Sequence, residues 1–480
     1  MKIKVTIITI IICLAYLQAR SQQIWSLEQC IEYALKNNIQ VKQQQLNLEI
    51  AKEDLLQSKI NLLPDLNANA THVYNFGQTI DLYTNTFATE RVQSNNFAIS
   101  SNLVLFSGLQ QFNNIKRNKL LLNASNFDLQ KMKDDIALQI ATAYLGILFN
   151  MELLDIAQKQ VDITKQQVDR TSKMVEAGTV ARGNQLTIEA QLASEEMQVV
   201  DAQNQLDLSI LLLTQLLDLP SPKGFMIEKP QINIAQEVLS TQTPESIYNS
   251  ALVNRPEIKS AELNLKSSKI NIAIAKGAIS PTIAISGSYG TGYSEASKRL
   301  KEVQPTGTND TLAYINVLGV DYPVTTPHYN TTYEKTPFST QINNNQNKSV
   351  GLYLSVPIFN RFQTKSRIAK AKIAYKNAEY MLDYQKNQLN KTIQQAYSDA
   401  TASLKRYTAA DKSVIAYQES FNYAEQRYNV GMLNPVDYND AKNKLLKSQS
   451  DLLQAKYNYV FRKKILDFYL GKPLTLVKGE

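Results

Sequence analysis

Cysteine and histidine are scarce in this sequence of 480 residues, which contains two of each. Cys13 lies in an N-terminal apolar run, which leaves Cys30 as a single cysteine and excludes an internal disulfide. His72 and His328 belong to no cluster with the spacing of a metal site. Phosphate-binding glycine loops and nucleophile elbows are also missing. We therefore expect neither an enzyme nor a bound cofactor or metal.

Long apolar runs are missing beyond residue 22, where none approaches about 20 residues. Membrane-spanning helices are therefore not expected in the mature chain. The N-terminus has Lys2 and Lys4, then an apolar run over 5–17, and small residues around Arg20. This order predicts a secretory signal peptide over 1–21, so the mature protein leaves the cytoplasm.

The sequence also has only a small excess of basic over acidic residues. The formal net charge is +8, and removing the signal peptide lowers it to about +5. The basic residues are spread among many Gln and Asn rather than massed on one face, so a nucleic-acid partner is not expected.

The sequence contains an internal repeat of two copies. Residues 34–66 align without a gap to residues 251–283, and further along Gly178 aligns to Gly431 and Pro220 to Pro473. The change of offset between these segments places an insertion in the second copy. We expect a first repeat over 22–220, a linker over 221–243 and a second repeat over 244–480, which carries an inserted loop over 294–348.

Each copy begins with a helix and continues with two strands. Ser26 with Gln29 forms a capping box, and Thr243 precedes Pro244 at the matching position. The first helix is expected over 26–63, ended by Pro64. The next segments, 66–76, 96–106, 282–293 and 349–356, alternate apolar residues with small or polar ones, which predicts four strands.

A very long helix follows each strand pair. Proline is absent over 107–178, and both proline and glycine are absent over 360–429. Ile140, Ile147, Leu154 and Val161 recur every seven residues, which predicts supercoiled packing over a rod of roughly 100 Å. The shorter helices, 26–63 and 184–219, would meet end to end beside it. Gly178 and Gly431 mark the hairpin tips, where Gly431 can adopt the left-handed conformation.

Strands with one apolar and one polar face are typical of a membrane β-barrel. The alternative is a soluble protein in which these strands form hairpins that pack on the helices. Four strands cannot close a barrel, and open edges must be paired inside lipid, so the chain must oligomerise. Only twelve or more strands leave a lumen. The loops over 77–95 and 294–348 would then be extracellular, and the helices periplasmic.

The doubled unit, with the segments "RYNVG", "VDYNDAKNKL" and "QAKYNYVFRKKILDFYLGKPL", resembles the outer membrane efflux protein family of TolC type. The resemblance implies an α+β membrane protein of the cell outer membrane. Three chains would form a 12-stranded β-barrel continued by a periplasmic coiled-coil barrel. It further implies passive export of small molecules or proteins, as the exit duct of a tripartite efflux or type I secretion system. The implied partners are outer-membrane lipid, a periplasmic adaptor and an inner-membrane transporter.

The resemblance also assigns site residues at the tips. The adaptor-docking positions match Gly178, Thr179, Val180, Val430, Gly431, Met432 and Leu433, and the periplasmic gate matches Asp437, Asp440, Tyr428 and Asn184. Asp437 and Asp440 share a helix face, and six such carboxylates in a trimer would favour cations. Alternatively, Asp437 has no role in a gate and lies in the first turn of a helix because its negative charge interacts favourably with the helix macrodipole.

This sequence departs from the family pattern at the gate. Members that close by a charged lock have an acid and an arginine where this chain has Asn184 and Leu433, although Tyr428 is kept. Closure through helix packing and neutral hydrogen bonds, including Asn184, is the resulting hypothesis. Two other functions stay open from the residues alone, a periplasmic adaptor and a structural coiled-coil envelope protein without a pore.

Overall fold

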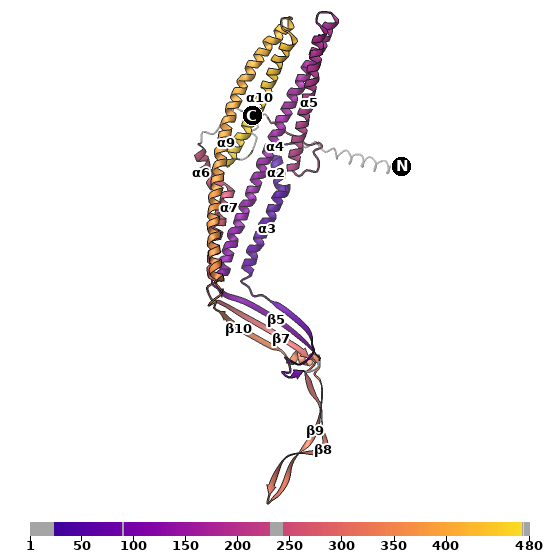
Figure 1. Cartoon of the computed structure of the whole chain (residues 1–480), viewed down its shortest axis with the longest axis vertical. Coiled ribbons are helices and arrows are strands. Elements are labelled where there is room, and N and C mark those ends of the chain that lie inside the picture. The colour runs from indigo at the N-terminus through magenta and orange to yellow at the C-terminus, as the bar shows by residue number, and fades with distance from the viewer. Residues whose placement is uncertain (1–23, 89–90, 231–242, 473, 475–480) are drawn as a thin grey trace, which may run out of the picture. The chain divides into compact units, whose positions relative to one another are not determined.

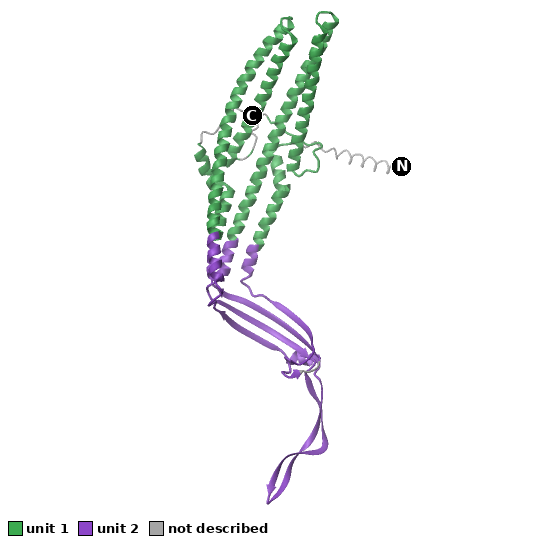
Figure 2. Ribbon diagram, in the orientation of Figure 1, with its two compact units in different colours: residues 1–53, 119–268, 374–480 green, residues 54–118, 269–373 purple. Residues whose placement is uncertain are grey.

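The computed structural model describes residues 24–88, 91–230, 243–472 and 474, so the expected signal peptide lies outside the described residues. The chain divides into two compact units (Figure 2). Unit 1 contains residues 1–53, 119–268 and 374–480, and unit 2 contains residues 54–118 and 269–373. Unit 1 is mainly helical, whereas unit 2 contains a sheet and the helix ends that adjoin its strands.

The same order of elements occurs in both halves of the chain (Figure 1). Two short helices come first, then two long strands, a helix of 67 residues and a helix of 35 residues. The helices of the first half are α2 (Leu27–Asn37), α3 (Ile39–Ile60), α4 (Gln110–Glu176) and α5 (Arg182–Leu216). Those of the second half are α6 (Pro244–Asn254), α7 (Pro256–Gly277), α9 (Gln363–Asn429) and α10 (Pro435–Tyr469).

The single helix expected over 26–63 is wrong, because the chain breaks at Asn38 between α2 and α3. Asn38 has an extended backbone, with φ −58° and ψ 132°, and its Oδ1 accepts the backbone N–H of Gln40 at 2.9 Å. Arg255 makes the matching break between α6 and α7, with φ −70° and ψ 129°. Here the cause is local, since Pro256 disfavours the helical conformation of the residue before it. The capping box of Ser26 and Gln29 is confirmed.

Each break lies where another helix ends. The predicted end-to-end meeting is therefore confirmed for α3 and α5, at Asn38, and not for the whole helix expected over 26–63. Asn38 Nδ2 donates to the carbonyl oxygen of Leu216, the last residue of α5, at 3.1 Å. Arg255 lies with its guanidinium carbon 4.3 Å from the ring centroid of Phe468 near the end of α10. It also pairs with Asp134 at 3.3 Å, so the buried cation is matched by charge.

The core of unit 1 follows the seven-residue stripe of α4. Ile140, Ile147, Leu154 and Val161 are all buried, as the spacing predicted. A window of α4 also passes the length and composition test for a membrane-spanning helix, contrary to the expectation of none. Residues Ile136, Tyr144 and Leu148 of this helix are buried in the largest apolar cluster, so packing within the protein accounts for their hydrophobicity.

Unit 2 is built on an antiparallel sheet with the strand order β10-β7-β5-β2. Its strands are β2 (Asn67–Asn75), β5 (Val92–Ser107), β7 (Thr282–Ser294) and β10 (Asn347–Ser355). The register puts Leu352 beside Ile285 and Leu103 on one face, whereas the other face has rows such as Ser349, Ser288 and Ser100. The predicted alternation of apolar and polar faces is therefore confirmed.

Three expected loops contain structure. The insertion expected as a loop over 294–348 is a long hairpin of β8 (Lys298–Val317) and β9 (Val320–Lys335), followed by α8 (Phe338–Asn344). Backbone pairing, which side-chain polarity does not prevent, explains this correction. The loop over 77–95 contains a small ladder of β3 (Thr79–Ile80) and β4 (Phe87–Ala88), and β5 already begins within it. Within the expected linker, β6 (Met226–Ile227) pairs in parallel with β1 (Ile24–Trp25).

Candidate functional site at the hairpin tips

The two tips of unit 1 end their long helices in the same way. Gly178 has φ +73° and donates its N–H to Val175 O at 3.0 Å, while Thr179 N–H bonds to Met174 O at 3.0 Å. Gly431 has φ +76°, with matching bonds from Gly431 to Tyr428 O and from Met432 to Arg427 O. This pair of bonds is the Schellman motif, in which glycine avoids the steric cost of positive φ. The left-handed conformation predicted for Gly431 is confirmed.

The returning helices begin differently. At the start of α10, Asn434 Oδ1 accepts the N–H of Asp437 at 2.8 Å, and Asn434 Nδ2 donates to Asp437 Oδ2 at 2.8 Å. Pro435 occupies the first turn of α10, where its missing N–H has no cost. At the start of α5 the cap position is Ala181, which makes no side-chain bond. Asp437 thus lies in the first turn of α10 and bonds to the cap residue Asn434, and its assignment to the gate stays a prediction.

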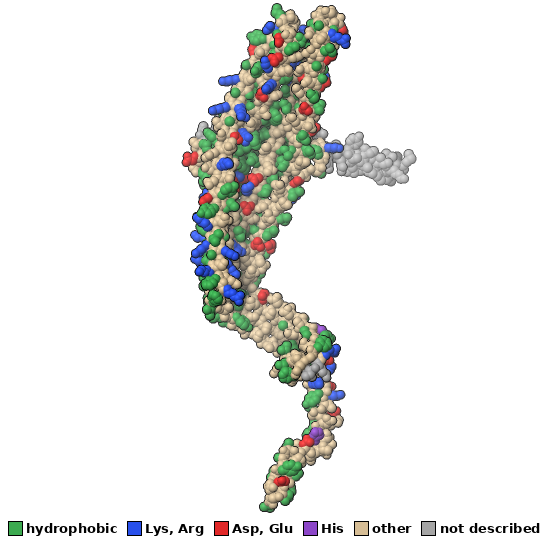
Figure 3. Space-filling model, in the orientation of Figure 1, with side chains coloured by type: hydrophobic (Ala, Val, Ile, Leu, Met, Phe, Trp, Pro, Cys, Tyr) green, Lys and Arg blue, Asp and Glu red, His purple; other side chains and the backbone are tan. Residues whose placement is uncertain are grey.

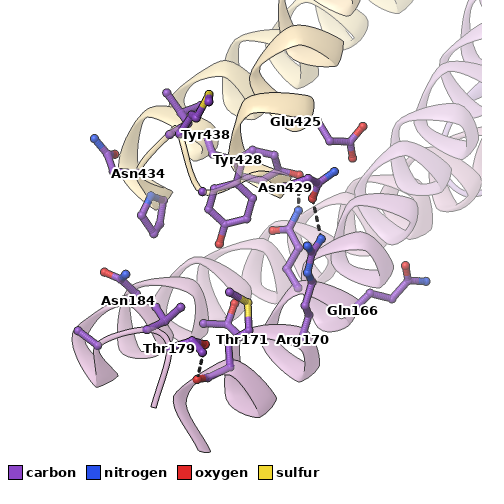
Figure 4. A pocket seen from close by; sticks show the side chains of 18 of the residues that line it. Gln166, Arg170, Thr171, Thr179, Asn184, Glu425, Tyr428, Asn429, Asn434 and Tyr438 are labelled. Carbon is purple, nitrogen blue, oxygen red and sulfur yellow. Dashed lines mark hydrogen bonds between the residues drawn. The ribbon is translucent and has the colours of Figure 1, made fainter. Parts of the chain in front are cut away.

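A cavity of about 770 Å³ lies between the two tips (Figure 4). It brings together most of the site residues proposed from sequence, namely Asn184, Tyr428, Thr179, Val180, Gly431, Met432 and Leu433. Gly178 and Val430 adjoin the cavity in sequence but do not line it. Asp437 and Asp440 do not line it either, and both side chains are exposed. Asp440 pairs with Lys444 at 2.7 Å on the surface of α10.

Contacts across the cavity hold the two hairpins together. Arg170 Nη1 of α4 donates to Asn429 Oδ1 of α9 at 2.6 Å (Figure 4). Tyr438 is buried, stacks on Tyr428 with ring centroids 4.6 Å apart, and accepts a hydrogen bond from Gln167 Nε2. Burial, and then the charge of Glu425, raises the pKa of Tyr438 to about 12, so its hydroxyl stays neutral. The side chain of Asn184 has no hydrogen bond within the described part of the chain.

A buried charged cluster also joins the two hairpins. Lys442 Nζ of α10 lies 3.3 Å from Glu195 Oε1 of α5, with side-chain exposures of 3% and 1%. Thr164 of α4 bonds to both Lys442 and Glu195. Gln191 donates to the same carboxylate at 2.8 Å. Burial lowers the pKa of Lys442 below its ordinary value, and the negative charge of Glu195 opposes that shift.

Sequence reasoning missed this cluster. Glu195 and Lys442 are 247 positions apart, and each lies among other charged and polar residues of an ordinary-looking helix. The hypothesis of closure through helix packing and neutral hydrogen bonds stays a prediction, and the structure adds a buried ion pair that joins the two hairpins. Across residues 24–88, 91–230 and 243–472, no group of His, Cys, Asp and Glu could hold a metal ion.

The sheet of unit 2 is antiparallel and amphipathic, and its outer strands have an unpaired edge among the described residues. In unit 1, two helices of 67 residues end in paired hairpins. These features define an outer-membrane channel with a helical extension. The sequence model of the family described as "Outer membrane efflux protein" matches residues 30–218 and 247–472. The chain belongs to this family. It is therefore an efflux channel of the outer membrane with its helices in the periplasm, and neither a periplasmic adaptor nor a coiled-coil protein without a pore.

Individual relatives resemble the chain over most of its length. Outer membrane protein TolC of Escherichia coli (strain K12) is 24% identical over 459 residues, covering 93% of this chain and 82% of TolC. The alkaline protease secretion protein AprF of Pseudomonas aeruginosa is 20% identical over 357 residues, covering 73% of this chain and 64% of AprF. The crystal structure of VceC from Vibrio cholerae superposes with a TM-score of 0.71 at 16% identity, covering 93% of this chain and 96% of VceC.

Proposed function

We propose that three copies of this chain form one continuous duct, with a 12-stranded barrel in the membrane and a coiled-coil tunnel below it. The observation that carries this proposal is the four-stranded sheet with an apolar face and two outer strands, β10 and β2, that have a free edge. Inside lipid, each free N–H and C=O of those edges must be paired. Two copies would give eight strands and a filled interior, whereas three give a lumen.

The sheet matches this role in size and chemistry. Its outer strands contain nine residues each, close to the 9–11 residues that a tilted strand needs to cross a bilayer. Val350, Leu352 and Leu354 are 80%, 70% and 67% exposed, so the single chain leaves the apolar face uncovered. Lipid would cover that face, and the opposite face of serine, glycine and asparagine would line the lumen. The two repeats over 22–220 and 244–480 would each supply two strands and one hairpin.

The hairpin tips are the proposed gate and docking region. Val430 and Met432 are 68% and 72% exposed, and Val436 is 66% exposed, although each is apolar. Such a patch at a tip suits docking of a periplasmic adaptor, which would link the duct to an inner-membrane transporter. Asp437 and Asp440, repeated by symmetry, would make the entrance selective for cations. Lys442 and Glu195 would hold the two hairpins of each subunit together.

The duct is proposed to serve efflux of small molecules or type I secretion of proteins. The name of AprF states secretion of a protease, and the family name states efflux. Transport through the duct would be passive and driven by its partners. A polar lumen accepts either class of cargo, and the transporter would select between them.

Conductance tests the proposal. The purified chain in planar bilayers should give discrete cation-selective steps, and its mass in detergent should be that of three chains. A channel without trimers would refute the subunit number. A protein that stays monomeric in water without detergent would refute the pore.

A further inference from the structure

A repeated pair of exposed side chains marks the four helix ends that adjoin the sheet of unit 2. In each, an exposed apolar residue lies on the strand side and an exposed lysine lies three or four residues farther from the strand. The pairs are Leu63 with Lys59, Phe112 with Lys116, Ile279 with Lys276, and Phe362 with Lys365. The apolar members are 64%, 54%, 61% and 65% exposed, and all four lysines are exposed. We name these eight residues the junction collar.

The members of each pair are three or four residues apart in the sequence. Phe112 and Lys116 both lie in α4, where this separation makes their side chains neighbours, whereas Leu63, Ile279 and Phe362 lie in the turns that flank α3, α7 and α9. In the pair at α9, Lys365 Nζ lies 5.5 Å from the centroid of the Phe362 ring. Lys365 is therefore placed beside an aromatic ring.

Positive charge dominates around the collar. Arg361, Arg367, Lys370 and Lys372 add four exposed cations at the start of α9, where Figure 3 shows Lys and Arg gathered. Asp54 is the only carboxylate among the described helical residues of unit 2. None of the four collar lysines forms a salt bridge within the described ranges. The exposed cations near the collar thus outnumber the carboxylates, and an anionic surface would attract them.

We propose that the junction collar binds the phosphate headgroups of anionic glycerophospholipids in the membrane leaflet on the helix side. The inference rests on the proposed function, because it requires the sheet to cross the membrane. Phe112 and Lys116 are four residues apart in α4, which is about 6 Å along the helix. The headgroup layer on each side of a bilayer is about 5–7 Å thick. The apolar member then enters the hydrocarbon edge while the lysine reaches the phosphates, as amphipathic side chains do at interfaces.

A lipid fits the collar better than a free phosphate ion. Phosphate alone would gain nothing from Phe112, Phe362, Leu63 or Ile279, whereas the acyl chain and glycerol of a lipid would cover all four. Each lysine also lies on a different helix and offers one ammonium, which is a weak site for a small anion in water. Near an anionic membrane surface each basic residue contributes a factor of about five in affinity.

The test compares two variants of the full chain that lose the same charge. One is K59Q/K116Q/K276Q/K365Q, and the control is K42Q/K391Q/K405Q/K412Q, which removes four exposed lysines of unit 1. Each trimer is reconstituted into nanodiscs of phosphatidylcholine with phosphatidylglycerol, then transferred to mild detergent. Mass spectrometry measures the ratio of retained phosphatidylglycerol to phosphatidylcholine. Parallel samples contain 10 mM inorganic phosphate or 0.5 M salt.

We expect wild type and the control to retain phosphatidylglycerol about five-fold above its bulk ratio, and the collar variant to lose that enrichment. Salt should weaken it, because exposed charges are screened. Equal enrichment in the collar variant, or none in wild type, would overturn the proposal. Displacement by phosphate alone would assign the site to a free ion and also overturn it. Planar-bilayer conductance separates the two claims, since a conducting wild-type trimer without enrichment refutes only the collar.

Discussion

The two hairpins of unit 1 have nearly the same backbone but different chemistry. Both end their long helix in a Schellman motif, at Gly178 and at Gly431. The second hairpin then begins its return with the cap of Asn434 and Asp437, whereas the first begins with the uncapped Ala181. The second also inserts Lys442 among residues of the first, while the repeat position of Lys442 in α5 is the exposed Glu189.

This difference separates what a repeat must keep from what it can change. A sharp reversal needs glycine at one position, so both copies have it. Caps, charges and buried contacts can differ because each hairpin has different neighbours. We propose that the gate chemistry lies mainly in the second hairpin, and the following four changes test that proposal.

The largest effect is expected at the buried ion pair. Lys442→Met leaves Glu195 buried without its cation and should destabilise the helical unit by about 3–5 kcal/mol. Thermal unfolding followed by circular dichroism measures this. The double variant with Glu195→Met should recover much of the loss. Glu189→Met, at the matching position of the first hairpin, should change stability by less than about 0.5 kcal/mol. Equal losses of stability in Lys442→Met and Glu189→Met would contradict the proposed difference between the two hairpins.

The second effect appears at high pH. The pKa of Tyr438 in the folded protein is about 12, above its ordinary value of 10.0, so the folded state favours the protonated hydroxyl. That stability is fully present below pH 10 and is lost as pH rises towards 12. Wild type should therefore lose about 2 kcal/mol more than Tyr438→Phe between these values. Unfolding curves with the same pH slope for both proteins would contradict the burial of a neutral Tyr438.

Exchanging the caps should reduce the difference between the hairpins. Asn434→Ala removes the side-chain acceptor for the Asp437 N–H and should cost about 1 kcal/mol. Ala181→Asn supplies an acceptor at the uncapped start of α5 and should add up to about 1 kcal/mol. Urea denaturation measures both changes. A gain at Asn434 or a loss at Ala181 would show that cap chemistry is not what distinguishes the two tips.

The smallest free-energy change concerns the gate acids. Asp440→Asn removes an exposed pair with Lys444, whose side chains are 60% and 56% exposed, so stability should hardly change. Cation selectivity, measured as the reversal potential in a salt gradient, should nevertheless fall. Asn184→Asp places an acid at the repeat position of Asp437 and should raise selectivity. Unchanged reversal potentials in both variants would show that these acids do not set the cation selectivity of the entrance.

Local patterns in the sequence were enough for much of the fold. The seven-residue stripe of α4, the glycine reversals and the alternation of the strands each depend on neighbours close in sequence, and all three are confirmed. The break at Asn38 was missed because its extended conformation accompanies a contact with Leu216, far along the chain. The matching break at Arg255 had a local signal in Pro256 that was not used. The pairing of β8 with β9 was hidden by a polar, proline-containing sequence.

The tip site shows the same limit. Residues assigned through the family resemblance, such as Asn184 and Tyr428, do line one cavity. Their partners could not be predicted, because Arg170 and Asn429, like Glu195 and Lys442, meet only through the packing of two separate hairpins.

Cross-linking between the free edges of the sheet tests the three-chain duct most directly. One cysteine replaces Ala70 in β2, and a second replaces in turn Val350, Leu352 or Leu354 in β10, with Cys30 changed to serine. In membranes under oxidising conditions, at least one pair should give a covalent ladder that ends at three chains. A ladder that ends at two chains, or no adduct at any position, would contradict the account.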